Sequence, residues 1–244
     1  MSKVIFIRHA ESVWNRDGRY TGWTDVDLTQ KGVAGANEIG HMLRVYGDKI
    51  DIAYTSMLKR AIRTLWIVLW EIDRMWIPVH RSWRLNERHY GNLQGQVKTE
   101  VRQRVGEEQF WIWRRSYATA PPALPEGDPR HPSNEEKYKD VPANLLPSTE
   151  SLADTLARAW VFWLGEIVPN LKDGKNILIS AHGNSIRALV KQLNRIDDEA
   201  ISRVEIPLAR PLIFEFDENA QVIDSYFLEN DGAQIRDIFH FSDR

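Results

Sequence analysis

Two histidines of the sequence each follow a strongly apolar run. His9 comes directly after the run 4–7 and Arg8, and His182 comes directly after the run 175–181. Short continuous apolar runs are typical of buried strands. Parallel strands of an α/β sheet place their sites beyond their carboxyl ends. If the two strands are neighbours, the imidazoles of His9 and His182 are expected to lie side by side.

A pair of histidines serves either metal binding or phosphoryl transfer. The sequence has no His-x-x-x-His or His-Glu-x-x-His motif, no acidic residue at tight ligand spacing and no cysteine, which argues against a metal. Phosphoryl transfer is favoured because arginine suits phosphate oxygens, and several arginines adjoin the candidate segments, namely Arg8, Arg60, Arg88, Arg114 and Arg115.

Glu87 is the candidate acid and base. A carboxyl group held near a leaving oxygen can donate a proton and recover it. Two ordinary interpretations stay open at this point: a lone arginine is usually solvated surface, and Glu87 can simply pair with one of them. Four further histidines are expected to be surface or structural residues: His41, His80, His131 and His240.

The composition is that of an ordinary globular protein. The 244 residues carry 32 Lys and Arg against 34 Asp and Glu, and 43% of them are hydrophobic. This excludes a wholly disordered chain and argues against bulk nucleic-acid binding, which needs a basic excess. No apolar run is long enough for a membrane span, and the first residues do not resemble a signal peptide, so we expect a cytoplasmic protein without membrane partners.

Apolar periodicity predicts strands that alternate with helices. The expected strands cover 4–7, 51–54, 76–80, 175–181, 212–216 and 222–227, and the expected helices cover 30–43, 57–74, 99–113, 151–167 and 183–193. This alternation predicts an α/β fold with a mainly parallel sheet. We expect one domain over 1–228. The proline-rich segment 116–148 is expected to be a long loop or lid, and 229–244 a mobile tail.

Several motifs resemble a known family. Residues 8–12 resemble the Arg-His-Gly signature of the histidine phosphatase superfamily. Residues 20–28, 54–61, 83–95, 106–117 and 181–189 resemble the cofactor-dependent phosphoglycerate mutases. The first motif is weak by itself, whereas the ordered set, which runs from about residue 4 to 227, is specific. The resemblance implies a three-layer sandwich, with a mainly parallel central sheet flanked by helices.

The resemblance also implies an activity, which is the interconversion of 3-phosphoglycerate and 2-phosphoglycerate in glycolysis and gluconeogenesis. The reaction is primed by 2,3-bisphosphoglycerate and needs no metal. His9 would carry the phosphoryl group as phosphohistidine, Glu87 would exchange the proton, and His182, Arg8 and Arg60 would stabilise the transfer. Family matches place a further set around the phosphates and carboxylate: Ser12, Asn15, Thr21, Gly22, Arg88, Tyr90, Lys98, Arg114, Arg115, Gly183 and Asn184. The expected partners are small phosphorylated three-carbon acids and further copies of the chain, as a dimer or tetramer.

The sequence departs from the family at two places. Ala10 stands where relatives have glycine, and Leu208-Ala209 stands where they commonly have Thr-Gly, with Arg210 next. An alanine is a small change unless the backbone needs a positive φ.

Three other functions compete. A plain histidine phosphatase would let water take the phosphoryl group. A bisphosphoglycerate mutase or synthase tends to have glycine at the position of Ser12 and to lack the Thr-Gly pair at 21–22. This chain has Ser12 and the Thr-Gly pair, which favours the monophosphoglycerate mutase. A non-catalytic phospho-ligand binder would tolerate the loss of His9, Glu87 or His182.

Overall fold

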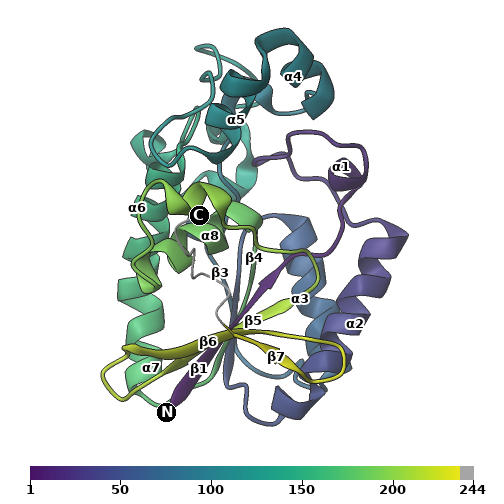
Figure 1. Cartoon of the computed structure of the whole chain (residues 1–244), viewed down its shortest axis with the longest axis vertical. Coiled ribbons are helices and arrows are strands. Elements are labelled where there is room, and N and C mark those ends of the chain that lie inside the picture. Colours follow the sequence, from purple (N-terminus) through teal and green to yellow (C-terminus); the bar gives the residue numbers. More distant parts are fainter. Residues whose placement is uncertain (237–244) are drawn as a thin grey trace.

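The computed structural model describes residues 1–236, and its centre is one seven-stranded sheet. The strand order is β3-β2-β4-β1-β5-β6-β7 (Figure 1). The strands are β1 Ser2–Arg8, β2 Ile52–Thr55, β3 Val79–Arg81, β4 Ile177–Ala181, β5 Pro211–Phe216, β6 Val222–Leu228 and β7 Gln234–Ile235. Strands β3, β2, β4 and β1 pair in parallel, whereas β5, β6 and β7 pair antiparallel with their neighbours. The expected α/β sandwich is confirmed, with a mixed sheet.

Helices α2 and α3 cover one face of the sheet, and α6, α7 and α8 cover the other (Figure 1). The α-helices are α1 Val13–Arg16, α2 Gln30–Gly47, α3 Lys59–Glu71, α4 Lys98–Val105, α5 Glu107–Arg115, α6 Leu152–Phe162, α7 Val168–Lys172 and α8 Gly183–Leu193. Successive strand residues point to opposite faces. Ile5 and Ile7 therefore pack with the apolar residues of α2 and α3, and Val4 and Phe6 pack with those of α6, α7 and α8. Both layers fix β1 and β4, whose ends carry the two histidines.

Helices α4 and α5 lie beyond the carboxyl ends of the parallel strands (Figure 1). The sequence predicted one helix over 99–113, and this was wrong. Gly106 has a φ of +80° and separates the two helices. Residues with side chains avoid this left-handed conformation, so the glycine marks the corner. The corner turns α5 so that its last residues, Arg114 and Arg115, reach the site described below.

The segment 116–148 is an ordered loop with three short 3₁₀ turns: Pro132–Asn134, Glu136–Tyr138 and Ala143–Leu145. Tyr138 and Leu146 are buried in a small apolar cluster with Trp23. The hydroxyl of Tyr138 accepts a hydrogen bond from Nδ2 of Asn86 at 2.8 Å. The loop is therefore anchored to the segments around residues 23 and 86.

The tail expected to be mobile over 229–244 begins with regular structure. The turn is closed by backbone hydrogen bonds from Glu229 to Ala233 and from Gly232 to Glu229, and Gly232 has a φ of +83°. This turn lets β7 pair with the end of β6. The hairpin satisfies its backbone groups locally, and the mobility of the tail stays a prediction. The remainder of the tail, 237–244, lies outside the described residues. Among residues 1–236, no helix has the length and apolar character that crossing a membrane requires.

The two alanines at family glycine positions differ in their backbone conformation. Ala209 has a φ of +54°, whereas Ala10 is not among the residues with positive φ. An alanine in the left-handed region costs about 1–2 kcal/mol relative to the right-handed form. The departure at Ala10 is therefore harmless to the backbone, and the departure at Ala209 is strained. Arg210, beside it, forms an ion pair with Glu229.

We predict that Ala209→Gly raises the free energy of unfolding by about 0.5–1 kcal/mol, because glycine removes the strain and only part of the gain is lost to the more flexible unfolded chain. Urea unfolding followed by circular dichroism measures the change. Ala10→Gly is the matched control and should lower the free energy of unfolding, since that buried position has no strain to relieve. Equal effects of the two changes would contradict the prediction.

Candidate active site

The two histidines that follow apolar strands meet at one edge of the sheet. Strands β1 and β4 are parallel neighbours, with Arg8 opposite Ala181. The backbone N–H of His9 donates to the carbonyl of Ala181 at 3.0 Å. The imidazole centroids of His9 and His182 lie 5.0 Å apart, and both side chains are buried. The expectation that the rings lie side by side is confirmed.

The hydrogen bonds of His9 define which ring nitrogen is free to react. Its Nδ1 lies 2.7 Å from the carbonyl oxygen of Ala10, which can only accept, so Nδ1 carries the proton. Nε2 then has a lone pair, and it accepts a hydrogen bond from Nε of Arg60 at 3.3 Å. Nε2 is therefore the ring nitrogen that could act as a nucleophile.

Both imidazoles are neutral at neutral pH. Burial, followed by the positive charges of Arg60 and Arg8, lowers the pKa of His9 well below its ordinary value. Burial, followed by the charge of Arg60 and by His9, does the same to the pKa of His182. A neutral imidazole is the form that can attack phosphorus.

His182 has one ring nitrogen without a hydrogen-bond partner, the buried Nδ1. The other nitrogen, Nε2, lies 2.8 Å from Oγ of Ser56, which accepts the backbone N–H of Leu58 at 3.1 Å. When the Ser56 hydroxyl donates to Nε2, the proton of the neutral ring is on Nδ1. In that tautomer Nδ1 can donate to an oxygen of a transferring group.

Glu87 is held from two sides. Its Oε1 accepts the backbone N–H of Arg88 at 2.8 Å and that of Asn184 at 3.0 Å. Asn184 is in the first turn of α8, where free backbone N–H groups favour a negative charge. The carbonyl of Glu87 accepts from Nε1 of Trp23 at 2.5 Å. The side chain is buried, so the carboxyl group has one defined position.

His9 and Glu87 line a polar cavity of about 100 Å³. Its walls carry two glutamates, Glu87 and Glu205, and seven cationic side chains: Arg8, Arg19, Arg60, Lys98, Arg114, Arg115 and Arg187. A surface with this excess of positive charge attracts multiply charged anions, although the whole chain has a net charge of −2. Among residues 1–236, no group of three or more His, Cys, Asp or Glu side chains is placed to hold a metal ion.

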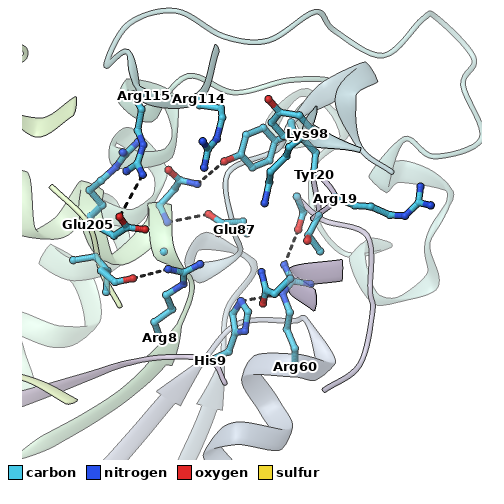
Figure 2. Close-up of a pocket in the computed structure, with 18 of the residues that line it drawn as sticks. Arg8, His9, Arg19, Tyr20, Arg60, Glu87, Lys98, Arg114, Arg115 and Glu205 are labelled. Atoms are coloured by element: carbon cyan, nitrogen blue, oxygen red, sulfur yellow. Dashed lines mark hydrogen bonds and ion pairs between the residues drawn. The ribbon is translucent and has the colours of Figure 1, made fainter. Parts of the chain in front are cut away.

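The cavity has two positively charged ends (Figure 2). Arg8, His9 and Arg60 lie together at one end, and Lys98, Arg114 and Arg115 lie at the other, with Glu87 between them. Burial, opposed in part by the charges of Glu87 and Asp25, lowers the pKa of Arg60 to about 10, so it stays charged at neutral pH. The arrangement can bind a molecule with an anionic group at each end and present a carboxyl group to the atoms between them.

Most site residues predicted from the sequence line this cavity: Arg8, His9, Asn15, Thr21, Gly22, Arg60, Glu87, Tyr90, Lys98, Arg114, Arg115, Gly183 and Asn184. The other three support it from behind. Ser12 caps α1 and donates to Oδ1 of Asn15. The buried guanidinium of Arg88 lies 4.5 Å from the ring centroid of Tyr90. His182 lies behind the wall, in contact with His9.

The structure adds lining residues that the sequence analysis missed: Arg19, Tyr20, Arg187 and the segment 204–206. Arg187 is one helical turn beyond Asn184, a spacing that could have identified it. The segment 204–206 has no periodic pattern. It contributes through Glu205, which pairs with Arg115 at 3.6 Å, and through the Ile206 carbonyl, which accepts from Arg8 at 2.6 Å. No residue of 116–148 lines the cavity, so a lid role for that loop stays a prediction.

Solved structures of known proteins share the fold. YhfR of Bacillus stearothermophilus has 24% identity and a TM-score of 0.69, with 91% of this chain and 95% of that chain covered. A mycobacterial glucosyl-3-phosphoglycerate phosphatase has 17% identity and a TM-score of 0.69, covering 91% and 97%. A phosphoserine phosphatase from Entamoeba histolytica has 22% identity and a TM-score of 0.61, covering 92% and 96%.

A family model extends this likeness to the sequence. The model of the histidine phosphatase superfamily (branch 1) matches residues 4–129 and 123–229, which is most of the chain and includes His9 and His182. The geometry of the site agrees with that match, since a neutral His9 and its arginines lie together in the cavity. The chain therefore belongs to branch 1 of the histidine phosphatase superfamily.

Proposed function

We propose that this enzyme is a phosphoglycerate mutase that depends on 2,3-bisphosphoglycerate and interconverts 3-phosphoglycerate and 2-phosphoglycerate. The observation that carries the proposal is the cavity with two positive ends and Glu87 between them. A phosphoglycerate has a phosphate and a carboxylate on three carbons, and the bisphosphate has a second phosphate. A site for these anions needs cations at both ends, which a site for a simple phosphomonoester does not need.

In the proposed reaction, His9 carries the phosphoryl group and Glu87 exchanges the proton. Nε2 of His9 attacks the phosphorus of a bound phosphate, a nitrogen–phosphorus bond forms, and the phosphorus–oxygen bond to the glycerate breaks. The leaving oxygen takes a proton from Glu87. In the reverse direction a glycerate hydroxyl gives its proton to Glu87, and its oxygen takes the phosphoryl group from His9. Arg8, Arg60 and the free N–H of His182 offset the negative charge of the group in transfer.

The charge of the cavity also fits the priming donor. Seven cationic side chains against two glutamates suit 2,3-bisphosphoglycerate, which has two phosphates and a carboxylate. The resemblance to the mutases at 20–28 and 106–117 supports the same choice. A homo-oligomer and a cytoplasmic location are further predictions from the resemblance and the sequence.

A second candidate function is a phosphatase that transfers the phosphoryl group from His9 to water. It is favoured by what the similar solved structures are called: one is a glucosyl-3-phosphoglycerate phosphatase and one a phosphoserine phosphatase. These proteins share less than 25% identity with this chain. The likeness therefore supports the fold and does not identify the molecule that accepts the phosphoryl group. The two functions differ only in whether a hydroxyl of the substrate or water attacks phosphohistidine.

The first experiment measures isomerisation and hydrolysis on the same enzyme. Chelator-treated enzyme is given 3-phosphoglycerate, with and without trace 2,3-bisphosphoglycerate. Formation of 2-phosphoglycerate is coupled to enolase, and free phosphate is measured separately. We expect strong stimulation by the bisphosphate and little free phosphate. His9→Ala should abolish both turnover and the acid-labile label that radioactive bisphosphate leaves on the enzyme. Phosphate release without isomerisation would replace the mutase by the phosphatase.

We predict that the rings of His9 and His182 stay neutral between pH 8 and pH 6, because burial and neighbouring arginines lower both pKa values. Histidine-labelled NMR spectra over this range test it, with signals assigned from His9→Gln and His182→Gln. The urea-unfolded protein is the control, and its histidines should titrate near pH 6.5.

The same pKa values make the stability of the fold depend on pH. Because the two pKa values are lower in the folded chain, the unfolded chain binds protons at a higher pH than the folded chain does. The free energy of unfolding should therefore fall as the pH drops below about 6.5. Titration of the His9 ring at pH 6.5 in the folded enzyme would refute the prediction.

We predict opposite effects of Arg187→Met on stability and on binding. Arg187 is buried with two unpartnered guanidinium nitrogens, and burial together with Arg88 lowers its pKa to about 9. Methionine removes this unfavourable charge, so the melting temperature should rise. The KM for 3-phosphoglycerate should rise about 10- to 150-fold through the loss of one charged contact, worth about 1.5–3 kcal/mol. The KM for p-nitrophenyl phosphate, which has no second anionic group, serves as the control and should stay within about twofold.

A further inference from the structure

A buried ion pair lies behind the cavity, outside its lining. Arg158 of α6 donates from Nε to Oε1 of Glu150 at 2.6 Å and from one terminal nitrogen to Oε2 at 2.9 Å. The two side chains are only 6% and 4% exposed. A buried ion pair contributes little net stability compared with apolar residues of the same size.

The pair also makes hydrogen bonds to the segment that carries Glu87. Arg158 donates to the carbonyl oxygens of Arg84 at 2.7 Å and of Glu87 at 2.9 Å. Oε2 of Glu150 accepts the backbone N–H of His89 at 2.7 Å. One ion pair thus binds the main chain on the N-terminal side of Glu87, at Glu87 itself and on its C-terminal side.

The segment needs this support because it has no regular structure of its own. Between the 3₁₀ turns Trp83–Leu85 and Gly91–Leu93, no helix or strand fixes the backbone. The carboxyl group of Glu87 reaches Asn184 in α8 through a single hydrogen bond of 3.0 Å. A shift of the main chain at residue 87 would break that bond and move the proton donor relative to His9.

We propose that Glu150 and Arg158 are positioning residues for proton transfer: they act through the main chain of residues 84–89 and set where the carboxyl group of Glu87 stands. This inference rests on the proposed role of Glu87 as proton donor. Neither residue touches the cavity, so their effect on the reaction passes through Glu87. A misplacement of about 1 Å in a catalytic group can cost about 100-fold in rate.

The test compares two phosphoryl donors that differ in their need for a proton. The alkoxide that leaves 2,3-bisphosphoglycerate must be protonated, whereas nitrophenolate leaves p-nitrophenyl phosphate without help from an acid. The measured quantity is the rate of His9 phosphorylation, normalised to the number of sites that can be labelled. Glu87→Gln is the reference and should slow labelling from the bisphosphate while leaving labelling from p-nitrophenyl phosphate within about twofold.

The main variant is Arg158→Lys, which keeps the charge but lacks the planar fork that reaches Glu150 and two carbonyls together. We expect labelling from 2,3-bisphosphoglycerate to fall about 10- to 100-fold, and labelling from p-nitrophenyl phosphate to change less than twofold. Glu150→Gln, which keeps the shape and an acceptor for His89, should give the same pattern and serves if the lysine variant does not fold. Arg44→Lys, in the exposed pair with Glu71, is the matched control and should change neither rate.

The outcomes separate the two claims. If Glu87→Gln distinguishes the donors and the variants at 150 and 158 do not, the positioning role is wrong and the proposed function stands. Equal loss with both donors in these variants would show a purely structural role and overturn the inference. If Glu87→Gln itself fails to distinguish the donors, Glu87 is not the proton donor, and the positioning role falls with it.

Discussion

The parallel pairing of β1 with β4 is the constraint on which the site depends. It places the residues that follow Arg8 and Ala181 at the same edge of the sheet, so two histidines separated by 173 positions have ring centroids 5.0 Å apart. The helix that follows β4 then presents its first backbone N–H groups to the same place, where one of them binds Glu87. The positions of His9, of His182 and of the backbone N–H that binds Glu87 thus all follow from one strand pair.

Burial gives this edge its chemistry. A solvated imidazole would be partly protonated near neutral pH and could not attack phosphorus in that form. Burial against the sheet, followed by the charges of Arg60 and Arg8, disfavours the protonated ring. The pKa of His9 is therefore well below its ordinary value. The same burial leaves guanidinium nitrogens of Arg8, Arg88 and Arg187 without partners. Such groups are unfavourable in the free protein and become favourable when an anion binds, which is the difference in free energy that a binding site needs.

The segment with the proposed proton donor is built differently from the strand end with the proposed nucleophile. His9 is fixed at the end of a strand, whereas Glu87 is in a segment without regular structure. Its position is defined by side chains of other segments: Trp23 and Arg158 bind its carbonyl. Such a segment can approach the substrate from above the sheet edge, where no strand reaches. The position of the Glu87 carboxyl group then depends on buried hydrogen bonds from residues that are far away in the sequence.

The sequence by itself determined the local and chemically distinctive features: the apolar runs before His9 and His182, the alternation of strands and helices, helix α8 with its correct bounds, and most of the cavity lining through motif resemblance. These features could be predicted because buried strands and amphipathic helices depend on patterns among residues that are close together in the sequence. Only the tertiary structure decided which cations share the cavity, that Arg187 and the segment 204–206 complete it, and that Ala209 rather than Ala10 is strained. It also decided that Gly106 divides a helix and that Arg158 supports Glu87. These features depend on backbone angles and on contacts between segments far apart in the chain, and no local pattern encodes either.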